Sequence, residues 1–402
     1  MSLVLGVALF ALALLISIAW HELGHMWAAQ ATGMKVRRYF VGFGPTLWST
    51  KRGETEYGVK ALPLGGFCDI AGMTPHEELT EDERARAMYA QPTWKRLVVL
   101  IAGPMQNFIL GFVLVLILGL GWGLPIIGNL PVYAKSMECV ALTTDAQGKP
   151  VECTGPAPAA GSGLQIGDQI LAVDGATVAG PSELIQDVQK AHDSVVLTVK
   201  RGDEQLDLTV PVTQVQRMVA KDGEEPHAAE VGAIGVGLDT KYTNEYNAVT
   251  IWGGALSFTG DIFAETFKAL VALPSKISGL WDAVTGGQRA ADSPVSVVGA
   301  SVLGGQAVER GLWDVFLGLL MSVNFFLGLF NLVPLLPLDG GHMAIALYEK
   351  VRNIFRRWRG LIPAGPIDYY KLLPVTYVVV VVMGGFMLLT LTADVVNPIK
   401  VF

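Results

Sequence analysis

The residues of this chain with the clearest chemistry are His21, Glu22 and His25, within the stretch A-W-H-E-L-G-H-M at residues 19–26. On a helix, His21 and His25 are one turn apart on the same face, so both imidazoles can hold one Zn²⁺. Glu22 lies beside them, where it can take a proton from a water molecule on the metal. The pattern therefore predicts a zinc site with a neighbouring general base.

The segment that positions this motif is hydrophobic. Residues 3–20 carry no charge, so we expect a first transmembrane helix over 1–28, long enough to cross a hydrocarbon core of about 30 Å. The run lacks a basic start and a cleavage site, which argues against a signal peptide. Polar side chains at membrane depth are costly, and they are functional candidates by default.

The composition points to the same environment. Of 402 residues, 51% are hydrophobic and only 16% are charged, whereas soluble proteins carry about 25% charged residues. The net charge of −7 argues against a nucleic-acid partner. We therefore expect an integral membrane protein with at least one soluble part and with membrane lipid as its surroundings.

Three further hydrophobic runs predict three more transmembrane helices, at 97–127, 314–341 and 372–394. The connecting segments 33–96 and 342–371 are rich in Lys and Arg, which places them in the cytoplasm as loops. Both termini and the polar segment after the second span are then extracytoplasmic. The expected fold is an α-helical membrane protein with four spans.

The first cytoplasmic segment contains two extended stretches, 36–49 and 56–67, with Lys51-Arg52-Gly53 near the turn between them. This pattern predicts a β-hairpin, and its apolar residues suggest that it is membrane-associated. The charged stretch 73–89 that follows predicts a surface helix.

Residues 130–214 are polar and predict a small α+β domain inserted outside the membrane. A helix is expected at 182–191, and a hairpin is expected around Arg201-Gly202-Asp203. Cys139 and Cys153 either form one bridge, which an extracytoplasmic location would permit, or remain two unpaired small residues. The linker 215–313 contains a helical pattern at 251–273. We expect an amphipathic helix on the membrane surface there, with an ordinary span as the competing interpretation.

A third zinc ligand is expected from the far end of the chain. Pro334 and Pro337 break the third span, and Asp339-Gly340-Gly341 follows. The first and third spans both run from outside to inside, so Asp339 reaches the depth of the two histidines. A catalytic zinc needs three protein ligands and one open position.

Several motifs together resemble the site-2 protease family of M50-type intramembrane zinc metalloproteases. They are H-E-L-G-H at residues 21–25, A-G-P-M-Q-N at 102–107 and N-L-V-P-L-L-P-L-D-G-G at 331–341. The stretch G-L-Q-I-G-D-Q-I-L-A-V-D-G at 163–175 resembles a bacterial PDZ domain. The stretches R-R-Y-F-V-G-F-G-P-T-L-W-S-T at 37–50 and P-L-G-G-F at 63–67 resemble the family's membrane-associated hairpin. The chain looks most like the actinobacterial members and has a single PDZ-like domain.

The resemblance implies roles for individual residues. It implies zinc ligation by His21, His25 and Asp339, and catalysis as general base by Glu22. Asn331 matches an asparagine associated with holding the substrate backbone. The remaining matches line the site and are assigned to substrate binding: Gly103, Pro104 and Asn107.

The activity implied is regulated intramembrane proteolysis in the bacterial plasma membrane. Substrates would be single-span proteins already cut on the outside, such as anti-sigma factors or signal-peptide remnants, with the PDZ-like domain as a size filter or docking site. Two other classes remain open. A metal transporter would also place His and Asp in the membrane, but it has no need for Glu22. An inactive peptide-binding scaffold has no need for the intact ligand set.

Overall fold

The computed structural model describes residues 2–142, 153, 155–219, 227–290 and 292–399. The chain forms two compact units, and each is described separately below. The first unit combines Met1–Trp122 with Asn247–Phe402, and the second is Gly123–Tyr246.

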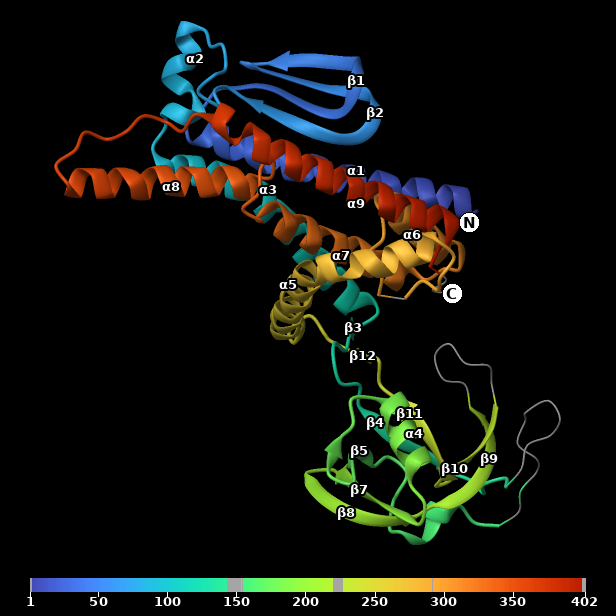
Figure 1. Ribbon diagram of the computed structural model, residues 1–402. Helices are drawn as coiled ribbons and strands as arrows, with labels where there is room; N and C mark the ends of the chain where they lie inside the picture. The colour runs from blue at the N-terminus through green and yellow to red at the C-terminus, as the bar shows by residue number, and fades with distance from the viewer. Residues whose placement is uncertain (1, 143–152, 154, 220–226, 291, 400–402) are drawn as a thin grey trace. The chain divides into compact units, whose positions relative to one another are not determined.

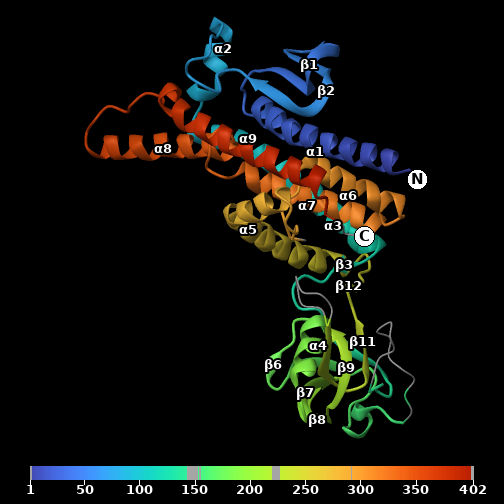
Figure 2. The ribbon, with the colours of Figure 1, turned by 45° about the vertical axis from the view of Figure 1, so that its right-hand side comes forward.

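The first unit is helical. Its helices are α1 (Leu3–Ala31), α2 (Glu81–Arg86), α3 (Thr93–Gly121), α5 (Ile251–Val284), α6 (Val297–Glu309), α7 (Trp313–Asn331), α8 (Asp339–Trp358) and α9 (Leu373–Val396). Within the described residues, α1, α3, α7 and the helix ending at Val396 are long and apolar enough to cross a membrane, which is the number expected. Figures 1 and 2 show α1, α3 and α7 side by side, and residue contacts join α1 to α3 and α3 to α7.

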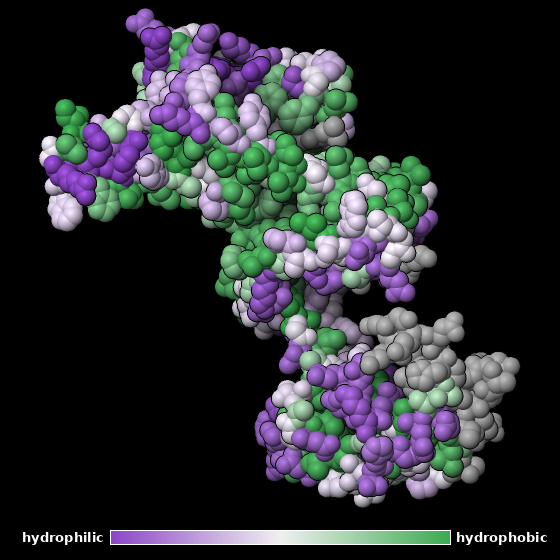
Figure 3. All heavy atoms as spheres, in the orientation of Figure 1, coloured by the Kyte–Doolittle hydropathy of each residue, from purple (hydrophilic) through white to green (hydrophobic). Residues whose placement is uncertain are grey.

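These helices expose apolar side chains and bury polar ones. Exposed residues on α1, α3 and α9 include Ile16, Ile117 and Val381, and hydrophobic side chains cover much of the visible face of this unit in Figure 3. Ser17 and Asn324 are buried between α1 and α7, and the Asn324 side-chain amide donates to the Ser17 hydroxyl at 3.1 Å. This inversion suits a lipid environment, where polar groups must find partners inside the protein.

The end of the third span differs from the sequence prediction. We expected the third span over 314–341 to be broken by Pro334 and Pro337 before Asp339; instead α7 ends at Asn331, before both prolines, and Asp339 is the first residue of a separate helix, α8. The prediction of a loop over 342–371 is wrong for its first half, because α8 continues to Trp358. The four Lys and Arg residues of α8 had suggested a loop, but the helix also has an apolar stripe with helical spacing, which includes Leu347, Val351 and Ile354.

The hairpin lies against α1. Strands β1 (Val36–Arg52) and β2 (Thr55–Ile70) are antiparallel, and residue contacts join β2 to α1. Helical structure in the charged stretch after the hairpin is limited to α2 and a 3₁₀ turn at Met88–Ala90. The predicted helix over 73–89 is therefore wrong for its first part, because Thr80 begins α2 with a capping box that includes Glu83.

The second unit is an α+β fold with one helix, α4 (Pro181–Lys190), among its described residues. Its main sheet has the order β11-β4-β5-β7-β8, with β6 paired to β5. The strands are β3 (Leu124–Pro125), β4 (Val132–Met137), β5 (Gln169–Val173), β6 (Ala176–Thr177), β7 (Ser194–Arg201), β8 (Glu204–Pro211), β9 (Thr213–Val219), β10 (His227–Ala233), β11 (Val236–Thr240) and β12 (Thr243–Asn244). The unit extends past the expected 130–214 because β11 pairs with β4 and completes the sheet.

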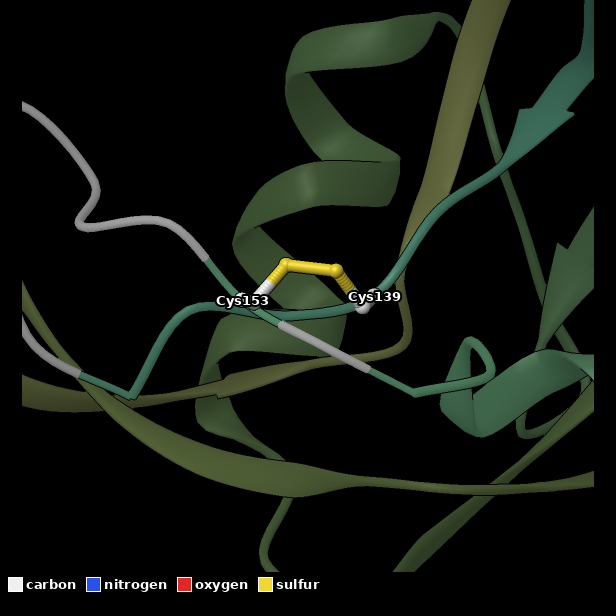
Figure 4. The surroundings of a disulfide bond; sticks show 2 residues. All are labelled: Cys139 and Cys153. Carbon is white, nitrogen blue, oxygen red and sulfur yellow. A yellow bond between two sulfur atoms is a disulfide. The ribbon is translucent and has the colours of Figure 1, made fainter.

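Cys139 and Cys153 form a disulfide in this unit, as Figure 4 shows. The sequence had left both the bridged and the unpaired state open. The bond closes the segment between β4 and the 3₁₀ turn at Pro158–Gly161.

The expected linker 215–313 is largely helical beyond the second unit. Helix α5 covers Ile251–Val284 and packs against α3, α7 and α9, while α6 packs against α1. Charged residues such as Asp261, Glu265 and Lys268 keep α5 out of the set of candidate spans. Its placement on the membrane surface stays a prediction.

Candidate metal centre

Three donor side chains from α1 and α8 converge inside the first unit. Nε2 of His21 lies 3.1 Å from Nε2 of His25, and Oδ2 of Asp339 lies 3.3 Å from each of these nitrogens. The three ligand atoms all lie within 4.8 Å of one another. Two imidazoles and a carboxylate, brought together across more than 300 residues, match the three-ligand set of a catalytic zinc site.

A tight turn places Asp339 here. The chain leaves α7 at Asn331 and folds back on itself before α8 begins. A Cβ on Gly340 would stand 2.3 Å from the carbonyl oxygen of Leu332, and a Cβ on Gly341 would stand 2.5 Å from the nitrogen of Leu336. Backbone atoms cannot move aside as the end of a flexible side chain can. Only glycine therefore fits at the two positions after Asp339, which explains the D-G-G sequence.

Helix α3 orients both histidines. Nδ1 of His25 donates to the carbonyl oxygen of Val99 at 2.8 Å. The proton on Nδ1 leaves the lone pair of Nε2 free to face the other donors. The Asn107 side-chain amide lies 3.1 Å from Nδ1 of His21 and is almost fully buried. Asn107, expected at the substrate, therefore also contacts a candidate ligand.

Gly103 leaves the space that the imidazoles occupy. A Cβ at this position would lie 2.2 Å from Nε2 of His25 and 2.8 Å from Nε2 of His21. Any larger residue at position 103 would therefore clash with the donor cluster. Pro104 follows inside the same helix and is buried.

Glu22 is held at the same place by the hairpin. Its Oε2 accepts the backbone N–H of Cys68, on β2, at 3.0 Å. The hairpin is fixed in turn by Tyr39, whose hydroxyl donates to the carbonyl oxygen of Ala19 at 2.7 Å. Strand β2 thus orients one carboxylate oxygen of Glu22, and α1 carries both Glu22 and the two histidines.

A cavity of about 320 Å³ joins these groups. Its lining includes the three donors, Glu22, Asn107 and Asn331. Asn331 is the last residue of α7, so its side chain lies where the helix stops. The structure therefore brings most of the residues singled out by sequence to one cavity, while Gly103 lies against its histidines.

Sequence reasoning missed two groups that shape the site. The N–H of Cys68 and the carbonyl of Val99 are backbone atoms, which no residue-type pattern could reveal. A third omission, the pairing of Arg96 with Glu349, had a weak signal. Glu349 is one of only two acidic residues in the basic stretch 342–371.

The donor chemistry fits zinc. The three converging atoms offer lone pairs from two nitrogens and one carboxylate oxygen, and the cavity beside them leaves room for a further ligand. Buried lone pairs that face one another are unfavourable without a cation between them. The arrangement is therefore one that a metal ion stabilises.

Comparison with known proteins agrees with this chemistry. The model of peptidase family M50 matches residues 9–361. The chain is 52% identical over 407 residues to zinc metalloprotease Rip1 of Mycobacterium bovis, covering 100% of both chains. It is 50% identical over 407 residues to zinc metalloprotease Rip1 of Mycolicibacterium smegmatis, covering 99% of each.

More distant similarity extends to other bacteria. The chain is 28% identical over 362 residues to putative zinc metalloprotease all3971 of Nostoc sp., covering 88% of this chain and 87% of that protein. The family match covers most of the chain, and the similarity to Rip1 proteins spans its full length. The chain therefore belongs to peptidase family M50, the site-2 protease family, and is a multi-pass membrane zinc metalloprotease.

Proposed function

We propose that this zinc metalloprotease hydrolyses peptide bonds within or near the transmembrane helices of single-span proteins. One observation carries the proposal. Three metal donors and Glu22 line a single cavity whose walls come from α1, α3 and α7, which are apolar enough to cross a membrane. This arrangement supports a substrate whose scissile peptide bond lies in a segment at membrane depth.

We assign zinc ligation to His21, His25 and Asp339. The assignment is supported by the mutual distances of their donor atoms, 3.1 to 3.3 Å. It is also supported by the hydrogen bond from Nδ1 of His25 to the carbonyl oxygen of Val99, since ligating histidines commonly donate their second N–H in this way.

We assign the role of general base to Glu22. When bound, zinc supplies Lewis-acid chemistry, which polarises the scissile carbonyl and makes water a stronger acid. Glu22 takes a proton from the attacking water and delivers it to the departing amine. The N–H of Cys68 holds one carboxylate oxygen during this transfer and leaves the other free to exchange the proton.

Substrate binding is assigned to Asn331, Asn107, Gly103 and Pro104. A helical substrate hides its carbonyls in hydrogen bonds, so it must unwind locally before attack. Asn331 can then pair with a freed backbone group, which would be costly to leave unsatisfied in the membrane.

The hairpin offers a second contact for an unwound segment. Its residues pair in the order 66–70, 36–41, 56–59 and 48–52, so the outer segments 66–70 and 48–52 each keep one edge onto which an extended chain could add. Large apolar side chains on the hairpin are exposed, which supports its association with the membrane: Phe43, Leu47, Trp48, Val59 and Leu62.

We further propose a bacterial plasma-membrane location, with both termini and the second unit extracytoplasmic. The Cys139–Cys153 disulfide supports an oxidising side for the second unit. We interpret this unit as a PDZ-like domain that filters or docks substrates. The basic segments 33–96 and 342–371 support a cytoplasmic side for the opposite face.

The substrates proposed are single-span proteins that have already lost their outer part, such as anti-sigma factors and signal-peptide remnants. This places the enzyme as the second cut in regulated intramembrane proteolysis and in stress responses that depend on it.

The decisive experiment compares wild type with Glu22→Gln on candidate single-span substrates in proteoliposomes. Loss of a general base lowers rates by about 10²- to 10⁴-fold, so we expect cleavage to fall at least about 100-fold. Zinc content should stay at one per chain, because Glu22 is not a ligand.

The matched control is Glu309→Gln, which removes an exposed carboxylate at the end of α6. It should cleave like wild type. Cleavage that survives Glu22→Gln at the wild-type rate would refute the assignment of the base. Cleavage restricted to soluble peptides would refute the intramembrane substrate class.

A further inference from the structure

A buried ion pair joins the helix that orients the histidines to the helix that carries the aspartate. Nη1 of Arg96, on α3, lies 2.5 Å from Oε2 of Glu349, on α8, and each side chain is 8% exposed. The two residues are 253 positions apart in the chain. Removing two charges from water carries a cost that a pair of apolar residues would avoid, so stability alone is a poor explanation for this pair.

Each residue of the pair is connected to the donor atoms through its own helix. Arg96 precedes Val99 by less than one helical turn, and the Val99 carbonyl fixes the ring of His25. Glu349 lies ten residues after Asp339 on one unbroken helix. A helix is stiff over this length of about 15 Å. The position of α8 perpendicular to its axis at Glu349 therefore constrains the position of Asp339.

Besides its contact with α3, helix α8 forms hydrogen bonds with the segment that follows it, such as that from Arg356 to the carbonyl oxygen of Ile362. Its buried residues include Ile345, Ala346 and Glu349, whereas Leu347 and Val351 on the opposite face are exposed. In Figures 1 and 2, α8 extends past the helices that pack beside its first turns. Gly340 and Gly341 follow Asp339 directly, so the first large side chain after it is that of His342.

The second carboxylate oxygen of Glu349 connects α8 to a further segment of the chain. Oε1 accepts the N–H of Ile367 at 2.7 Å, in the segment that leads to α9. Tyr369, shortly beyond, stacks on His342 of α8 with ring centroids 5.8 Å apart. Glu349 is therefore the point where α3, α8 and the approach to α9 meet.

We propose that Arg96 and Glu349 are positioning residues that set the location of Asp339 relative to His21 and His25. The inference rests on the proposed zinc ligation by these three residues. It adds that zinc affinity and coordination geometry depend on a pair that touches neither the metal nor the substrate.

The molecule provides a matched control in a second buried ion pair. Arg289 Nη2 lies 2.7 Å from Oδ1 of Asp394, with side chains 2% and 5% exposed. This pair ties the segment before α6 to the end of α9 and contacts no residue of the donor cluster. It has comparable burial and charge, so it reports what loss of a buried pair does to the fold alone.

The test measures zinc affinity by chelator competition, and the visible spectrum of the Co²⁺-substituted protein, on purified full-length chain. Outer contacts of metal ligands are worth about 10- to 100-fold in affinity. We expect Glu349→Gln to weaken zinc binding by about 10-fold and to change the Co²⁺ spectrum. Asp394→Asn should lower the melting temperature and leave both metal readouts at their wild-type values.

Glu349→Asp guards against misfolding of the first variant. It keeps the charge but shortens the reach by one methylene group, so it should alter the Co²⁺ spectrum in a folded protein. Wild-type zinc affinity and an unchanged spectrum in folded Glu349→Gln or Glu349→Asp would overturn the proposal, as would equal metal effects from Asp394→Asn.

Asp339→Ala separates this inference from the function on which it rests. If Asp339→Ala retains tight zinc binding, the ligand assignment fails. If Asp339→Ala loses zinc while the Glu349 variants behave like wild type, only the positioning role fails.

Discussion

Two clusters of buried polar side chains in the helical unit have similar burial but opposite hydrogen-bonding patterns. At the end of α9, Asp394 accepts from Arg289 and from the N–H of Ser296, and Arg289 also donates to backbone carbonyls. At the cavity, the donor atoms of His21, His25 and Asp339 face one another. In the first cluster the carboxylate of Asp394 faces hydrogen-bond donors, although Nε of Arg289 has no partner, whereas the second cluster requires a cation.

The comparison shows how a buried ion pair that stabilises the fold can be distinguished from a binding site inside a membrane protein. Burial alone cannot do so, because the side chains of both clusters are largely buried, at 2% to 5% exposed in the first and 8% to 17% exposed in the second. The direction of the lone pairs does distinguish them. Lone pairs that converge on one point without a proton between them are unfavourable unless a ligand binds there. Variants at Gly103 and Asp394 test that distinction.

The largest effect should come from Gly103→Ala. The new methyl carbon would lie 2.2 Å from Nε2 of His25, so the two histidines must move apart. We expect zinc affinity to fall by at least about 100-fold, beyond the effect of an outer contact, and proteolysis to fall with it. Equilibrium dialysis with metal analysis measures the first, and a cleavage assay measures the second.

Gly121→Ala is a suitable control on the same helix, because a Cβ there meets no atom within 4 Å. It should bind zinc like wild type. Normal zinc binding by Gly103→Ala would show that the histidines are not held against α3 as described.

A smaller effect, confined to stability, should follow Asp394→Asn. The change leaves Arg289 buried without its counter-charge, which typically costs about 3–5 kcal/mol. Thermal unfolding in detergent should therefore begin at a lower temperature, while each folded molecule still binds one zinc. Loss of zinc from the folded variant would contradict the separation of the two clusters.

The smallest effect belongs to a third cluster, which is partly open to water. Arg37 lies beside Glu83 and lowers the pKa of that carboxyl to about 2, with help from the N–H of Thr80. A depressed pKa contributes stability above the usual value near 4.5, and this contribution is lost as pH falls toward 2. Because solvent screens the pair, we expect only about 1 kcal/mol at pH 7.

Melting curves of wild type and Glu83→Gln should therefore differ at pH 7 and approach each other between pH 5 and pH 2. A difference that grows on acidification would contradict the ionised pair.

The sequence predicted the histidine pair and Glu22 because helical spacing alone places them together. It predicted Asp339 less directly, from topology and from a family resemblance. It could not predict that Asp339 begins a new helix, because the basic residues of 342–371 suggested a loop. Long-range contacts such as Arg96 with Glu349 depend on how α3 and α8 pack, which local patterns do not encode.

The spans were predictable for a different reason. Uncharged hydrophobic runs have a strong signal, since lipid tolerates little else. The limits of the second unit were less clear, because β11 pairs with β4 from about 100 residues away. Pairing at that distance depends on the folded sheet rather than on local composition.

The central claim is that two imidazole nitrogens and one carboxylate oxygen hold the zinc. X-ray absorption at the zinc edge tests it most directly in the purified wild-type chain. The account predicts only nitrogen and oxygen scatterers, at about 2.0–2.1 Å. It also predicts loss of bound zinc in Asp339→Ala. A zinc–sulfur distance near 2.3 Å would instead indicate Cys68, which lines the same cavity, and would contradict the account.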